Sequence, residues 1–142
     1  MILLDSNILI HGNQEASPHF NTITTRLIEL AESDEELAIC PQVLYEFFSV
    51  ATRPITARGG LGISSANALA LIDKFQSTYT FINDPVDLFS TWLQLIVRYG
   101  TVGIASHDAR LVAFMQKEDI QKIFTMNPND FNRYNNIITI LT

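Results

Sequence analysis

Short apolar runs alternate along the chain with longer segments in which apolar positions recur at helical spacing. The short runs predict buried strands at residues 2–4, 37–40, 78–82, 121–126 and 137–141. The longer segments predict helices at residues 19–32, 41–53, 64–76, 86–99 and 106–117. Between the last two helices, the stretch GTVGIAS is compatible with either a short strand or a loop.

The order of these elements indicates the fold class. Strands that alternate with helices favour a parallel sheet, and strands that are apolar throughout are covered on both faces. We therefore predict an α/β protein with three layers, α/β/α, around a central parallel sheet of about five strands. The 142 residues suit one domain, residues 1–142, and no internal repeat or low-complexity linker divides them.

Composition narrows the class of protein. Hydrophobic residues make up 47% of the chain and charged residues 17%, which is typical of a folded globular protein. The one cysteine, Cys40, excludes an internal disulfide and fits a reducing compartment. The start MILL lacks the basic segment of a signal peptide, and no apolar stretch approaches the roughly 18 residues of a membrane span. We expect a cytoplasmic protein with no membrane partner.

The charge of the chain limits how it could bind nucleic acid. The net charge is −6, and only 9 residues are Lys or Arg. This balance argues against a broad basic surface for phosphates. Nucleic acid remains possible if metal ions neutralise a carboxylate cluster and a few arginines contact the backbone locally.

Several acidic residues occupy positions that call for an explanation. Asp5 follows the first predicted strand, where open α/β sheets bind ligands, but in the sequence Asp-Ser-Asn it is equally suited to cap a helix. Glu46 shares one side of its predicted helix with Val43 and Val50, so it lies either on a solvated border or toward the interior. Taken alone, neither Asp5 nor Glu46 is strong evidence for a ligand-binding site.

Two further polar clusters lie later in the chain. Asp108 heads an apolar stripe on its predicted helix, where a carboxylate also complements the helix dipole. Asn127 and Asp130 follow the fourth predicted strand in TMNPNDF, a sequence that is also compatible with an ordinary turn. In a doubly wound sheet all four clusters could meet at one edge. Such a carboxylate cluster favours hard divalent cations, Mg²⁺ or Mn²⁺, and the chain has no Cys pair or His spacing for zinc.

Other reactive or aromatic side chains have simpler interpretations. His107 is adjacent to Asp108, and neighbours on a helix do not face each other, so a surface role is favoured over a general base. Cys40 is interpreted as a small buried strand residue. Trp92 lies at helical spacing with Leu95 and Ile96, which is more typical of core packing or a partner surface than of a base-stacking platform.

Four stretches together resemble a known family. They are LLDSNILI at the start, PQVLYEFFSVATRP around Glu46, ASHDARLVAFM around Asp108 and FTMNPNDF near the end. In this order and spacing they resemble the PIN-domain ribonucleases, most closely the VapC-type toxins of bacterial toxin–antitoxin pairs, over nearly the whole chain. The resemblance implies a compact PIN fold with acidic residues that bind Mg²⁺ or Mn²⁺.

The resemblance also implies roles for individual residues. Asp5, Glu46 and Asp108 match the first three acidic positions of the family, and Asn7 matches a polar residue that helps at the first motif. Many PIN domains have Asp where this chain has Asn127, so we expect Asp130 to be the fourth carboxylate and Asn127 a neutral helper. Arginines that could hold an RNA backbone are Arg53, Arg58, Arg98 and Arg110.

The function implied by this resemblance is metal-dependent endoribonuclease activity. A metal-activated water would cleave an RNA phosphodiester bond in line and leave 5′-phosphate and 3′-hydroxyl ends. Members of the family usually form homodimers, and a small cognate antitoxin inhibits them by inserting a basic side chain into the acidic groove. We therefore expect an RNA substrate, an antitoxin partner and a homodimer.

Two alternatives remain open from the sequence. One is a catalytically weak or inactive PIN-like scaffold that binds RNA or a partner protein, which the presence of Asn127 allows. The other is an aspartyl phosphotransferase or phosphatase with Asp5 as the nucleophile. The third residue of DSN is Asn rather than Asp, however, and no catalytic Lys follows at a suitable strand end.

Overall fold

A computed structural model describes residues 1–140 of the chain. The strands are β1 (Ile2–Leu4), β2 (Leu37–Ile39), β3 (Thr80–Phe81), β4 (Lys122–Phe124) and β5 (Ile138–Ile140). The α-helices are α1 (Ser6–His11), α2 (Phe20–Glu32), α3 (Pro41–Thr52), α4 (Ser65–Thr78), α5 (Leu88–Tyr99) and α6 (Ala105–Lys117). A short 3₁₀-helix, η1 (Pro128–Phe131), precedes β5.

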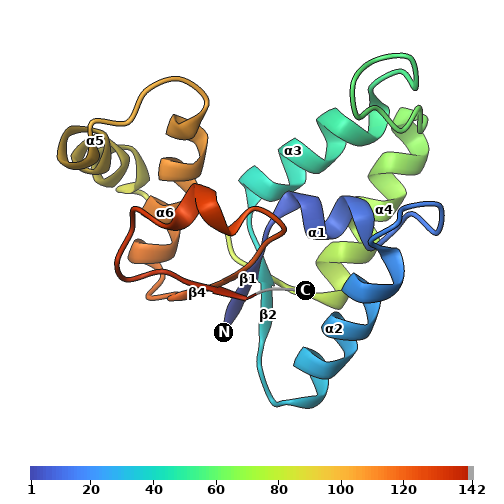
Figure 1. Cartoon of the computed structure of the whole chain (residues 1–142), viewed down its shortest axis with the longest axis horizontal. Helices are drawn as coiled ribbons and strands as arrows, with labels where there is room; N and C mark the ends of the chain where they lie inside the picture. Colours follow the sequence, from blue (N-terminus) through green and yellow to red (C-terminus); the bar gives the residue numbers. More distant parts are fainter. Residues whose placement is uncertain (141–142) are drawn as a thin grey trace.

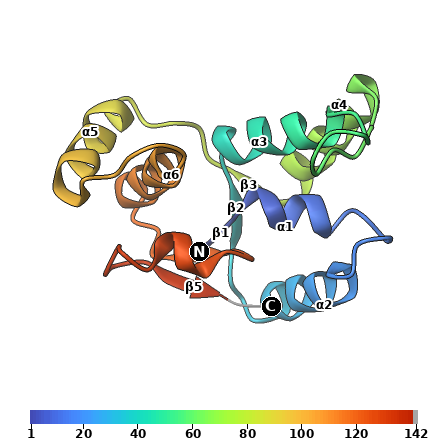
Figure 2. The ribbon, with the colours of Figure 1, turned by 45° about the horizontal axis from the view of Figure 1, so that its top comes forward.

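The five strands form one sheet in the order β3-β2-β1-β4-β5, and every neighbouring pair is parallel. Helices α1 to α4 lie on one side of the central strands and α5 and α6 on the other (Figures 1 and 2). The predicted α/β class, with three layers around a parallel sheet of five strands, is therefore confirmed. No helix within residues 1–140 is both long and apolar enough to cross a membrane.

The apolar pattern explains why β1 lies at the centre of the sheet. Ile2, Leu3 and Leu4 are all buried, because helices cover both faces of a central parallel strand. The same holds for β2, in which all three residues are buried. In the edge strand β3 neither residue is buried. The strand is two residues long, whereas the sequence predicted one over 78–82.

The predicted helices all form, with small shifts at their ends. Pro41 opens α3, and the hydroxyl of Ser64 caps α4 by accepting a hydrogen bond from the Asn67 amide. The ambiguous stretch GTVGIAS forms a loop and then the start of α6. Of the predicted strand 137–141, Ile138–Ile140 form β5, and residue 141 lies outside the described part of the chain.

Two short helices lie outside the segments predicted from helical spacing. One is α1, which is only six residues long and begins directly after β1 and Asp5, where the sequence left open a helix capped by Asp5. The other is η1, which forms where the sequence indicated a turn. Both are too short for helical periodicity to identify them, and both lie at the carboxyl end of a strand.

The strand order creates a switch point between β1 and β4. From β1 the chain builds outward through β2 to β3, and then it returns to add β4 and β5 on the other side of β1. Because the two connections leave β1 and β4 in opposite directions, a crevice opens at the carboxyl ends of these strands, where open α/β sheets bind ligands. Asp5 and Thr125 are the first residues after β1 and β4, and Leu4 pairs with Phe124 in register.

Candidate functional site

Asp5 lies at the switch point and is 8% exposed. Its Oδ1 accepts a hydrogen bond of 2.7 Å from the Ser6 amide, which caps α1. Its Oδ2 accepts from the Thr125 hydroxyl at 2.6 Å and from the Asn7 side-chain amide at 3.0 Å. Asp5 is thus both the helix cap and the carboxylate at the strand end, the two roles that the sequence presented as alternatives.

Asn7 connects the ends of the two central strands. Besides donating to Asp5, it accepts a hydrogen bond of 3.2 Å from the Met126 amide at its Oδ1. Thr125 is completely buried, and its hydroxyl oxygen also accepts from the Asn127 amide at 3.0 Å. These contacts fix the orientation of the Asp5 carboxylate before any ligand is present.

Glu46 reaches the same region from α3. Its Oε2 accepts a hydrogen bond of 2.9 Å from the Ser6 hydroxyl, and its Oε1 accepts one of 3.0 Å from the side-chain amide of Gln42. Ser6 therefore lies between the carboxylates of Asp5 and Glu46. Of the two orientations that the sequence allowed for Glu46, the structure shows the inward one.

The charges of the cluster raise the pKa values of two of its carboxyl groups, those of Asp5 and Asp108. Burial is the largest cause that raises the pKa of Asp5, and the negative charge of Glu46 raises it further, against the hydrogen bond from Thr125. Burial and the charges of Asp130, Asp5 and Glu46 together raise the pKa of Asp108 to about 7. The structure therefore brings the four acidic residues of the predicted site into mutual repulsion.

Asp108 and Asp130 complete the cluster from α6 and η1. Asp108 is in the first turn of α6, and among the carboxylates Asp130 has the largest effect on its pKa. Asp130 is exposed, as is Asn127 just before η1. The charge of Arg133 lowers the pKa of Asp108 and so partly offsets the repulsion there, and no feature of the sequence singled this residue out.

The donor set of this acidic cluster (Asp5, Glu46, Asp108 and Asp130) suits a hard divalent cation. All its charged donors are carboxylate oxygens, the ligands that Mg²⁺ and Mn²⁺ prefer. Within the described residues, however, no three Asp, Glu, His or Cys side chains are arranged closely enough to hold a metal ion as they stand. The four carboxylates thus interact electrostatically through Asp108, but they are not already arranged as a metal-ligand shell.

A buried amide that the sequence did not reveal joins this cluster to its surroundings. Gln42 is 6% exposed and donates to the main-chain oxygen of His107 at 2.8 Å as well as to Glu46. Its own Oε1 accepts from Arg110 Nη1 at 3.0 Å, and Arg110 Nη2 pairs with Asp84 at 2.8 Å. A polar residue four positions before Glu46 on an apolar helix was the available signal.

The four arginines predicted to hold RNA have different environments. Arg53 donates to the main-chain oxygen of Arg58, and both belong to the region after α3. Arg98 lies 5.3 Å from the centre of the Tyr99 ring on α5. Only Arg110 has a hydrogen-bonded connection to the acidic cluster, through Gln42.

The remaining candidates have structural explanations. His107 is exposed, and it contributes its main-chain oxygen rather than its ring to the contact with Gln42. Cys40 is fully buried, and burial raises the pKa of its thiol to about 12, which is inconsistent with a nucleophile.

Comparison with known proteins identifies the fold. Residues 2–137 match the PIN domain. The structure is similar to VapBC2 from Rickettsia felis bound to a promoter DNA fragment, with a TM-score of 0.73 and 20% identity over 100% of this chain and 99% of that chain. It is also similar to VapC20 from Mycobacterium tuberculosis, a sarcin–ricin loop cleaving toxin, with a TM-score of 0.68 and 18% identity over 94% and 95% of the two chains.

DNA-bound VapBC from Salmonella typhimurium gives a TM-score of 0.69 and 18% identity over 99% of this chain and 98% of that one. No curated protein matches the sequence significantly. Identities this low establish a shared fold rather than a shared activity. The match to the family itself spans nearly the whole chain, and the chain is therefore a member of the PIN-domain family.

Proposed function

We propose that the protein is a divalent-metal-dependent endoribonuclease. The observation that carries this proposal is the electrostatic environment of Asp108, whose pKa is raised to about 7 by burial and by the charges of Asp130, Asp5 and Glu46. Four carboxylates at the edge of a sheet repel one another, and this arrangement is typical of a site that a cation completes. Membership of the PIN-domain family supports the same conclusion.

The residues that would hold the cation, Mg²⁺ or Mn²⁺, are Asp5, Glu46, Asp108 and Asp130. When bound, such an ion lowers the pKa of a water molecule and stabilises negative charge on the oxygens of a phosphodiester. The chain contributes orientation: Ser6, Asn7 and Thr125 direct the Asp5 carboxylate, while Ser6 and Gln42 direct that of Glu46. Asn127 is a neutral helper beside Thr125.

The substrate class is RNA, supported by the likeness to a toxin described as cleaving the sarcin–ricin loop. With a net charge of −6, the chain needs the cation and a few local arginines to tolerate a phosphate backbone. Of the candidate arginines, Arg110 is the best placed, because it is connected to Glu46 through Gln42. Arg53, Arg58 and Arg98 remain candidates for contacts farther along the strand.

We further propose that the protein is the toxin of a type II toxin–antitoxin pair and acts as a homodimer in the cytoplasm. Support comes from similar structures, among them a toxin–antitoxin complex from Klebsiella pneumoniae with a TM-score of 0.61 and 21% identity over 98% of this chain and 97% of that chain. Induced expression in a bacterial host tests this role. Growth should stop with the wild type and continue with Asp5→Ala, whereas unimpaired growth with both would contradict it.

Cleavage of an end-labelled RNA tests the enzymatic proposal. The wild type should cut in Mn²⁺ or Mg²⁺, should stop when EDTA is added, and should leave 5′-phosphate ends. Asp5→Asn should lose activity while keeping the circular dichroism spectrum of the wild type. Asp73→Asn changes an exposed carboxylate on α4 and is the matched control, which should cut normally.

The same assay addresses both alternatives. RNA binding that EDTA does not change, without cleavage in Mn²⁺, would favour a non-catalytic PIN-like scaffold. A covalent phosphoaspartate trapped at Asp5 would favour a phosphotransferase or phosphatase. One observation favours the non-catalytic scaffold: among the described residues, no three potential ligands are arranged to hold a metal ion.

A further inference from the structure

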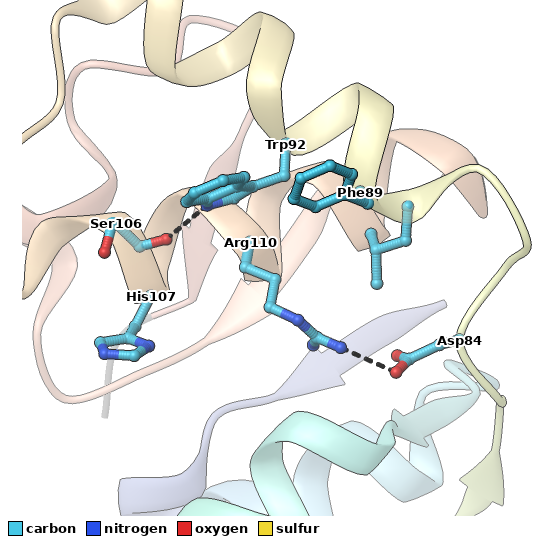
Figure 3. Close-up of a pocket in the computed structure, with 7 residues that line it drawn as sticks. Asp84, Phe89, Trp92, Ser106, His107 and Arg110 are labelled. Carbon is cyan, nitrogen blue, oxygen red and sulfur yellow. Dashed lines mark hydrogen bonds and ion pairs between the residues drawn. The ribbon is translucent and has the colours of Figure 1, made fainter.

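A cavity of about 500 Å³ lies beside the acidic cluster, between the start of α5 and the first turns of α6. Phe89 and Trp92 line it from α5, and Ser106, His107 and Arg110 line it from α6 (Figure 3). Asp84 lies at its far end, where it pairs with Arg110 (Figure 3). This volume is within the range of about 300–1,000 Å³ for sites that bind small organic groups.

The aromatic side of the cavity is flat and fixed in orientation. The rings of Phe89 and Trp92 are stacked at an interplanar angle of 25°, with centroids 5.9 Å apart. The indole N–H of Trp92 donates to the main-chain oxygen of Ser106 at 2.8 Å, which holds the ring against α6. Trp92 is partly buried and packs against the core, whereas Phe89 is 69% exposed, so part of this aromatic surface is free to contact a ligand.

The opposite side presents a positioned cation. The guanidinium of Arg110 is held by Asp84 (Figure 3) and by Gln42, so its orientation at the edge of the cavity is defined. Of its five N–H donors, the described contacts use two. The remaining donors can meet acceptors of a ligand, as arginine does with N7 and O6 of guanine.

The cavity and the acidic cluster share structural elements. His107 immediately precedes Asp108 on α6, and Arg110 is connected to Glu46 through the side chain of Gln42. A group that contacts Arg110 in the cavity is therefore separated from the Glu46 carboxylate by one side chain, that of Gln42. With a phosphate at the carboxylates, the group that a nucleic-acid strand would bring to this position is a nucleobase.

From these contacts we infer that the cavity is a nucleobase subsite, which binds a purine of the RNA strand beside the scissile phosphate and prefers guanine. The base stacks on Trp92 and Phe89 and accepts hydrogen bonds from Arg110. This inference rests on the proposed function, since it takes RNA as the substrate. It assigns to Trp92 the stacking role that its sequence position did not favour.

The lining fits a base better than it fits an apolar partner helix. A partner helix or a second copy that sealed the cavity with apolar side chains would bury the free N–H groups of Arg110 without acceptors, which is unfavourable. A base brings both an apolar face for the aromatic rings and polar edges for the guanidinium.

Trp92 is the one tryptophan of the chain, so its fluorescence reports directly on the cavity. In EDTA, where no cleavage occurs, we expect saturable quenching by guanosine 5′-monophosphate, weaker quenching by uridine 5′-monophosphate and none by ribose 5-phosphate. A uridine oligomer carrying one guanosine should quench at lower concentration than the mononucleotide, because its phosphates add contacts.

Two equally exposed aromatic residues provide matched variants. Phe89→Ala should weaken binding of the guanosine oligomer about five-fold or more, as expected for loss of one stacking partner. Tyr45→Ala removes a side chain that is 68% exposed on α3, outside the cavity, and should bind like the wild type. Circular dichroism of both variants checks that the fold is intact.

The outcomes separate this inference from the proposed activity. Base-dependent quenching without any cleavage in Mn²⁺ would retain the subsite and contradict the nuclease. Cleavage without quenching, or equal quenching by ribose 5-phosphate, would overturn the subsite and leave the nuclease. Tighter binding of the mononucleotide than of the oligomer, or emission that changes only with protein concentration, would also overturn it.

Discussion

The carboxylate of Asp5 is buried because donors on three residues compensate for the water that it loses. The Ser6 amide, the Asn7 side chain and the Thr125 hydroxyl all donate to it. Burial and the charge of Glu46 nevertheless raise the pKa of Asp5. The three hydrogen bonds therefore do not fully offset the free-energy cost of keeping this carboxyl group charged. At the residue scale, the site is stabilised by hydrogen bonds and destabilised by repulsion among its own carboxylates.

Asp108→Asn tests this conflict between stability and function. The amide removes one charge from the cluster, so the metal-free variant should have a higher melting temperature than the wild type. Cleavage should fall by about 10²–10³-fold or more, as it does when a main electrostatic group of an active site is lost. Thermal unfolding in EDTA and RNA cleavage in Mn²⁺ measure the two effects, and a less stable but fully active variant would contradict the account.

Cys40 provides a second test at the residue scale. Because it is buried and its pKa is raised to about 12, the thiol should not react with iodoacetamide in the folded protein at about pH 8. In denaturant the same reagent should modify it fully. Mass spectrometry distinguishes the two states, and rapid modification of the folded protein would show that the end of β2 is accessible.

At the scale of elements, Gln42 joins α3 to α6. Its amide donates to Glu46 on its own helix and to the main chain of His107 on α6, beside Asp108. Two carboxylates of the cluster are therefore positioned relative to each other by one buried side chain. The sequence predicted both helices but left open whether Glu46 faces solvent or the interior. A contact between residues 65 positions apart could not be predicted without the packing of the helices.

Gln42→Met keeps the approximate shape of the side chain and removes its hydrogen bonds. We expect a loss of about 1–3 kcal/mol in the free energy of unfolding, because Arg110 and the oxygen of His107 lose a buried partner. Metal affinity should fall about 10–100-fold, as for other residues that orient a ligand. Urea unfolding and Mn²⁺ titration provide the measurements.

Gln76→Met, at an exposed position of α4, is the control and should change neither quantity. If Gln42→Met lowered stability but left Mn²⁺ affinity unchanged, the role of Gln42 in positioning Glu46 would be wrong.

At the scale of the whole molecule, the switch point between β1 and β4 explains why the polar clusters meet. The sequence predicted the parallel sheet, and with it that Asp5, Glu46, Asp108 and Asp130 could meet at one edge. Thr125 could not be assigned a role in this way, because its hydrogen bond to Asp5 depends on β1 and β4 being neighbours. The pair Asp84–Arg110 likewise depends on how the chain after β3 passes α6.

The stability of the metal-free protein should depend on pH in a defined direction. Asp108 has an ordinary pKa of 3.8 and a pKa of about 7 when folded, so the folded state holds the proton more tightly. Its contribution to stability is present below about pH 4 and is lost as the pH rises toward about 7. Burial lowers the pKa of His11, which acts in the opposite direction, so a comparison is needed.

Wild type and Asp108→Asn should therefore be unfolded by urea in EDTA at about pH 5 and about pH 8. The free energy of unfolding of the wild type, relative to the variant, should be lower at the higher pH. A difference that stays constant or increases with pH would contradict the proposed repulsion among the carboxylates.

If the four carboxylates form one divalent-cation site, calorimetric titration with Mn²⁺ will detect it. We expect saturable binding by the wild type and by Asp73→Asn, and at least about ten-fold weaker binding by Asp108→Asn. Wild-type protein that binds no Mn²⁺, or an Asp108→Asn variant that binds it as tightly as the wild type, would contradict this proposal.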